Sequence, residues 1–70
     1  MIVTIVTDTK GNQALYCQGE LQEGGCPLPA ADALDAVAEY MHGSIHSWFS
    51  VKRLKVSYLV TEWPDKLEDL

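Results

Sequence analysis

The stretch that decides the predicted fold is residues 29–49, PAADALDAVAEYMHGSIHSWF. At about 100° per residue, its apolar side chains fall within one arc of roughly 120°, which is typical of a helix packed on one side. These apolar side chains are Leu34, Val37, Ala38, Met41, Ile45, Trp48 and Phe49. Pro29 suits the first helical position, where a missing N–H costs nothing. The stretch predicts one helix over 29–49, in which Gly43 favours a kink.

Two stretches before this helix predict a β-hairpin. Residues 1–7, MIVTIVT, are β-branched and apolar on both faces, which indicates a central strand. Residues 8–12, DTKGN, are turn formers, and residues 13–18, QALYCQ, form the returning strand. Residues 19–28 hold three glycines and a proline without periodicity, so we expect a loop there.

A third strand is predicted over residues 51–61, VKRLKVSYLVT, where side chains alternate. Leu54 and Val56 are expected to face the helix, and Arg53 and Lys55 to face away from it. The element order ββαβ then gives an α+β fold: a single domain over 1–70, with a three-stranded antiparallel sheet ordered 2-1-3 and one long helix on one face. The other face of the sheet has only the acidic C-terminal tail, 61–70, to cover it.

Composition limits the classes of function. Ten acidic and five basic residues give a net charge of −5, which disfavours direct binding to duplex DNA or to anionic lipid. No stretch is apolar for long enough to span a membrane, and the first residues lack the features of a signal peptide. We therefore expect a cytoplasmic protein whose two cysteines are reduced.

Four residues carry metal-binding chemistry in the sequence: Cys17, Cys26, His42 and His46. The histidines stand one helical turn apart, and the residue types are those of a zinc site. The cysteine spacing, however, differs from that of a zinc knuckle. A buried thiol, a loop thiol and two solvated histidines are the favoured interpretation, so we expect no cofactor. No motif for nucleophilic or acid–base catalysis is present, and we expect no enzymatic activity.

The expected function is that of a non-catalytic protein-binding module. An uncovered sheet face and a negative charge favour a small acidic inhibitor or adaptor that binds a basic surface of a nucleic-acid-handling protein. Inhibitors that phages and mobile elements direct against host defence form such a class by analogy. The alternatives are a homodimer formed through the open face or an edge strand, and a small zinc-binding domain. The predicted contact residues are Asp32, Asp35, Glu39, Tyr16, Arg53, Lys55, Trp63, Glu68 and Asp69.

Overall fold

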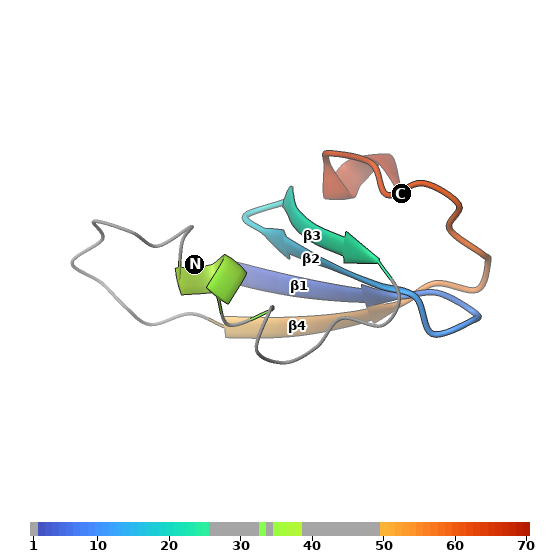
Figure 1. Ribbon diagram of the computed structural model, residues 1–70, viewed down its shortest axis with the longest axis horizontal. Helices are drawn as coiled ribbons and strands as arrows, with labels where there is room; N and C mark the ends of the chain where they lie inside the picture. The colour runs from blue at the N-terminus through green and yellow to red at the C-terminus, as the bar shows by residue number, and fades with distance from the viewer. Residues whose placement is uncertain (1, 26–32, 34, 39–49) are drawn as a thin grey trace.

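A four-stranded mixed sheet in the order β3-β2-β1-β4 forms the centre of the computed structural model (Figure 1). The structure describes residues 2–25, 33, 35–38 and 50–70. The elements are β1 (Ile2–Thr7), β2 (Gln13–Cys17), β3 (Glu20–Gly25), β4 (Ser50–Lys55) and a short 3-10 helix, η1 (Leu67–Asp69). Ala33 and Asp35–Ala38 are helical.

The predicted β1–β2 hairpin is present. The strands are antiparallel, with Val3 opposite Cys17 and Thr7 opposite Gln13. Asp8 organises the connecting turn, because its Oδ1 accepts hydrogen bonds from the backbone N–H groups of Lys10 and Asn12, both at 2.9 Å. Residues 8–12 thus form the turn that their sequence predicts.

The prediction of a loop over 19–28 is wrong for Glu20–Gly25, which forms β3 antiparallel to β2. The reason lies in the connection between the strands. Gln18 and Gly19 have φ angles of 52° and 81°, and Cys17 pairs with Glu20 across them. Two central residues with positive φ form the type I′ turn, whose twist suits a two-residue hairpin. Pairing with β2 therefore overrides the weak strand propensity of a glycine-rich segment.

The added strand also overturns the predicted antiparallel sheet. Because β3 reverses the chain once more, β4 runs parallel to β1, with Ile2 opposite Ser50 and Thr7 opposite Lys55. β4 ends at Lys55, so the predicted strand over 51–61 is shorter than expected. Of the long helix predicted over 29–49, the structure describes a short helical segment at Ala33 and Asp35–Ala38, and the other residues lie outside the described part.

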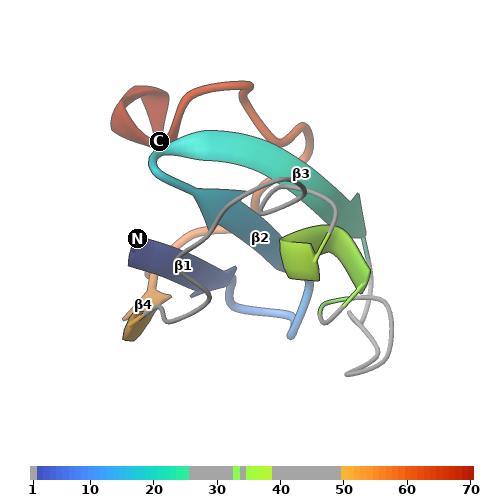
Figure 2. The same cartoon turned by 90° about the vertical axis from the view of Figure 1, so that its left-hand side faces the viewer.

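Each face of the sheet carries a separate cluster of buried side chains. Val3, Leu15 and Cys17 pack against Ala36 and Val37 of the helical segment. The opposite face is covered by the C-terminal segment, contrary to the prediction of an open face (Figure 2). The cluster on that face consists of Val6, Ala14 and Tyr16 with Leu21, Val56, Trp63, Leu67 and Leu70.

The C-terminal segment is fixed by specific contacts. The Tyr16 hydroxyl donates a hydrogen bond of 2.7 Å to the Pro64 carbonyl oxygen. Trp63 packs so closely on Gly24 that an added Cβ would lie 2.9 Å from the indole Cδ1. Backbone hydrogen bonds from Leu21 to Asp65 and from Leu67 to Gly19 hold the segment beside β3. The tail is therefore an integral part of the fold.

Candidate functional site

The outer side of β4 is a sheet edge that pairs with no further strand in the described structure. Figure 1 shows β3 and β4 as the two outermost strands. The C-terminal segment lies along β3, whereas among the described residues β4 pairs with β1 alone. All six residues of β4 are exposed.

The direction of the free backbone groups follows from one hydrogen bond. The Val56 N–H donates to the Thr7 carbonyl oxygen at 2.9 Å, so the backbone groups of even-numbered residues point toward β1. The backbone N–H and C=O groups of successive residues in a strand point in alternate directions. The N–H and C=O groups of Val51, Arg53 and Lys55 therefore point away from the sheet, where a further strand would pair.

Apolar side chains gather around the same strand. In the described part of the chain, the exposed large apolar residues are Ile2, Val51, Leu54, Tyr58 and Leu59. Val51 and Leu54 belong to β4, Ile2 pairs with Ser50, and the remaining two follow β4 closely in sequence. We call Ser50–Lys55 with Ile2, Tyr58 and Leu59 the β4 edge. Large apolar surface is expensive to leave in water and marks interaction sites when it is contiguous.

The β4 edge is also basic. Lys52, Arg53 and Lys55 are three of the five basic residues of the chain, and residues 50–61 contain no Asp or Glu. By the register with β1, Arg53 shares a face with Ile5, and Lys52 shares the opposite face with Thr4. Positive charge therefore lies on both sides of the free backbone groups.

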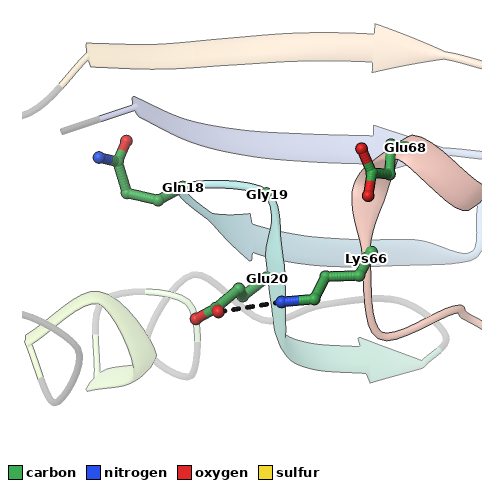
Figure 3. A pocket seen from close by; sticks show the side chains of 5 residues that line it. All are labelled: Gln18, Gly19, Glu20, Lys66 and Glu68. Carbon is green, nitrogen blue, oxygen red and sulfur yellow. Dashed lines mark hydrogen bonds and ion pairs between the residues drawn. The ribbon is translucent and has the colours of Figure 1, made fainter.

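The opposite edge of the sheet is acidic. Exposed carboxylates on β3 and on the C-terminal segment, residues 61–70, are those of Glu20, Glu23, Glu62, Asp65, Glu68 and Asp69. Figure 3 shows the Lys66 side chain extending to Glu20, with Nζ and Oε1 3.1 Å apart. These two residues, with Gln18, Gly19 and Glu68, line an open pocket of about 280 Å³. The hydrogen bond from Lys66 to Glu20 and the charge of Glu20 raise the pKa of Lys66.

The predicted contact residues fall into different environments. Tyr16 is fully buried with an exposed fraction of 0%, and burial, followed by the charge of Asp65, raises its pKa. Tyr16 offers no surface to a partner, and it lies on the face opposite to Arg53. Trp63 is half-buried against Gly24. The exposed members of the predicted set are Asp35, Arg53, Lys55, Glu68 and Asp69.

Other predicted residues lie outside the described part of the chain. These are Asp32 and Glu39 of the contact set, and Cys26, His42 and His46 of the zinc set. The remaining member of the zinc set, Cys17, is a free thiol packed among aliphatic side chains, and burial raises its pKa. Within the described residues, no group of three or more His, Cys, Asp or Glu side chains is placed to hold a metal ion.

Asp8 is a buried carboxylate that sequence reasoning treated only as a turn residue. Its exposed fraction is 1%, and its Oδ2 accepts hydrogen bonds from Asn12 Nδ2 at 2.9 Å and from the Val60 N–H at 3.1 Å. Burial alone would raise the pKa of Asp8, but these hydrogen bonds and those from the Lys10 and Asn12 backbones lower it overall. With every contact directed at its own turn and at Val60, Asp8 holds the structure together.

Sequence reasoning missed the apolar part of the β4 edge. The predicted alternation turned Leu54 toward the helix, whereas Leu54 is exposed and, by its register with Val6, lies on the face that the C-terminal segment covers. Alternation puts successive residues on opposite faces, but which face each one takes depends on the pairing of β3 and the placement of the tail. The Gln18-Gly19 pair was the available signal for β3, since a hairpin turn there adds a strand beside β2 and leaves β4 at the opposite edge.

Comparison with known proteins adds no relative: no family model matches the chain, and no curated protein or solved structure matches it significantly. In the described residues, no helix has the length and apolar character needed to cross a membrane.

Proposed function

We propose that this chain is a non-catalytic protein-binding module that binds an extended segment of its partner along the β4 edge. The observation that carries the proposal is the coincidence of two features on one strand. In the described structure β4 pairs on one side only, and the exposed large apolar side chains gather around it.

Strand addition suits this geometry. An extended peptide that joins a sheet edge gains affinity from main-chain hydrogen bonds and specificity from alternate side chains. Val51, Arg53 and Lys55 present three N–H and three C=O groups in the required direction, as deduced from the Val56–Thr7 hydrogen bond. Val51 and Leu54 supply apolar contacts on the two faces. A partner strand beside β4 would therefore form main-chain hydrogen bonds and apolar side-chain contacts at the same time.

Self-pairing through β4, the homodimer expected as an alternative, is opposed by charge. In a symmetric antiparallel pair of β4 strands, the outward-pointing residues Val51, Arg53 and Lys55 must lie opposite outward-pointing residues of the second copy. The central pair is then Lys52 opposite Lys52, or Arg53 opposite Arg53. Like charges directly opposite each other destabilise a strand pair, and basic residues commonly protect edges in this way.

The test uses a panel of nine-residue extended peptides of varied charge, with binding followed by fluorescence anisotropy. Arg53→Pro removes an outward N–H and leaves the inward bonds of Lys52 and Leu54 to β1 in place. We expect peptides to bind the native chain and Arg53→Ser, which keeps the N–H, but not Arg53→Pro. Circular dichroism of both variants checks that each of them folds. Failure of every peptide to bind, or equal binding by Arg53→Pro, contradicts the proposal.

A second candidate function rests on the acidic edge. The carboxylates of β3 and the C-terminal segment lie on the side of the sheet opposite β4, so they favour a partner with a basic surface. This second candidate is the inhibitor or adaptor role that the sequence predicts. We propose the cytoplasm as the compartment in which it acts. Capture of basic proteins from a cell extract should fall on Glu68→Lys and persist on Asp35→Lys, which makes the same change in net charge on the helical segment. Equal loss in both variants would show only a response to net charge.

A further inference from the structure

We infer that the segment bound by the β4 edge is acidic, with carboxylates and apolar side chains in a defined order. This inference rests on the proposed function, because it names the partner of the same edge. Its basis is the basic character of the strand and the side of the sheet on which each basic residue stands.

The basic side chains of β4 have no acidic partner in the described structure. The ion pair found there joins Lys66 to Glu20 on the opposite edge of the sheet. Lys10 adds a fourth positive charge near this end of the sheet, because its neighbour Thr9 donates a backbone hydrogen bond to Tyr58 at 3.4 Å. A partner with carboxylates would therefore meet unpaired positive charge, whereas a basic one would be repelled.

The register of a fifth strand sets the order of its side chains. Residues directly opposite each other in a sheet share a face, so each residue of β4 selects the one facing it. Carboxylates are favoured opposite Lys52, Arg53 and Lys55, and apolar residues opposite Val51 and Leu54. The favoured order along β4 is apolar, acidic, acidic, apolar, acidic. Apolar residues of the partner then fall on both faces of the extended sheet.

A single-stranded nucleic acid is the other anionic polymer that this edge could attract. The outward N–H and C=O groups of a strand edge match a peptide backbone in both donors and acceptors, whereas a phosphate backbone offers acceptors only. The observations thus favour an acidic peptide.

The test compares three peptides that differ only in charge: acetyl-TVEEVEEVT-amide, its Gln version TVQQVQQVT and its Lys version TVKKVKKVT. The acidic sequence reads the same in both directions, so it satisfies the favoured order in a parallel or an antiparallel strand. We expect it to bind about tenfold more tightly than the Gln peptide, from three added charge pairs. The Lys peptide should bind more weakly than either.

Variants locate the preference. Replacing Lys52, Arg53 and Lys55 together by Gln should abolish the difference between the acidic and Gln peptides, and high salt should reduce it. Arg53→Gln and Lys66→Gln form a matched pair, because each removes one positive charge and Lys66 lies on the far edge. Only Arg53→Gln should weaken binding of the acidic peptide, by about twofold.

The possible outcomes distinguish the preference for an acidic segment from the proposed function, strand addition at the β4 edge. Equal binding of the acidic, Gln and Lys peptides overturns the acidic preference and leaves strand addition standing. Absence of binding by any peptide removes both. Tighter binding of a twelve-residue oligo-dT than of the acidic peptide also overturns the inference, because the edge would then serve a nucleic acid.

Discussion

Removing the hydroxyl of Tyr16 tests how the C-terminal segment is held on the sheet. The side chain is fully buried, and its hydroxyl donates a 2.7 Å hydrogen bond to the Pro64 carbonyl oxygen, 48 residues away in sequence. Tyr16→Phe deletes this bond while the aromatic ring stays in place. The free energy of unfolding therefore falls by the contribution of one hydrogen bond, because no side-chain-sized cavity forms.

The magnitude follows from the value of one intramolecular hydrogen bond, about 1 kcal/mol of net stability. For a domain of this size, that loss lowers the melting temperature by about 4–8 °C. The backbone bonds from Leu21 to Asp65 and from Leu67 to Gly19 remain, so the segment should stay attached. The urea m-value should then be unchanged, because the same surface is exposed on unfolding.

Urea and thermal unfolding, followed by circular dichroism, measure both quantities. Tyr58→Phe is the matched control, because Tyr58 is exposed and no hydrogen bond of its hydroxyl is found within the described residues. A melting temperature equal to that of Tyr58→Phe would refute the reasoning about the Tyr16–Pro64 bond. A fall in the m-value would refute the claim that the two backbone bonds suffice to retain the segment.

Three further predictions concern Asp8, Cys17 and the contact between Gly24 and Trp63. Because the folded chain lowers the pKa of Asp8, its contribution to stability is present above the unfolded pKa, about 3.9, and is lost as pH falls through the lower folded pKa. Thermal unfolding between pH 6 and pH 2 should therefore vary less in Asp8→Asn than in the native chain; equal variation would contradict this. Burial raises the pKa of Cys17, so iodoacetamide at pH 8 should alkylate it far more slowly in the folded chain than in urea, as peptide mass mapping would show; similar rates would place the thiol at the surface. Gly24→Ala should cost about 1–3 kcal/mol in urea unfolding, because the new Cβ meets Trp63, and Trp63→Ala should remove most of that cost; an undiminished penalty would exclude this clash.

Local patterns predicted the hairpin and the faces of its strands. MIVTIVT followed by DTKGN gave the first two strands, because β-branched residues and turn formers act over a few residues. The alternation that separates Val3, Leu15 and Cys17 from Val6, Ala14 and Tyr16 matches the two buried clusters. These features need no knowledge of the rest of the chain.

The features that depend on distant pairing were not predictable in the same way. β3 has little strand propensity, and its pairing with β2 stabilises it. The direction of β4 depends on how often the chain has reversed before it, so one missed strand changed antiparallel to parallel. The tail covers a face because Trp63 fits over Gly24, a match between residues far apart in sequence.

The candidate site was predictable only in part, because some of its features are local and others depend on distant pairing. The sequence indicated Arg53 and Lys55 as contact residues, and both are exposed. Val51 and Leu54 join them on the β4 edge only because the strand is outermost and the tail covers β3. Burial of Tyr16 follows from the tail as well, which sequence patterns alone did not place.

Backbone amide hydrogen exchange across β4, measured by NMR on the free protein, tests the central claim that this edge is available for pairing. We expect alternation: slow exchange at Lys52, Leu54 and Val56, whose N–H groups point to β1, and fast exchange at Val51, Arg53 and Lys55. Adding the acidic peptide should slow the second set. Slow exchange at that set in the free monomer would contradict the account, because the edge would already be paired.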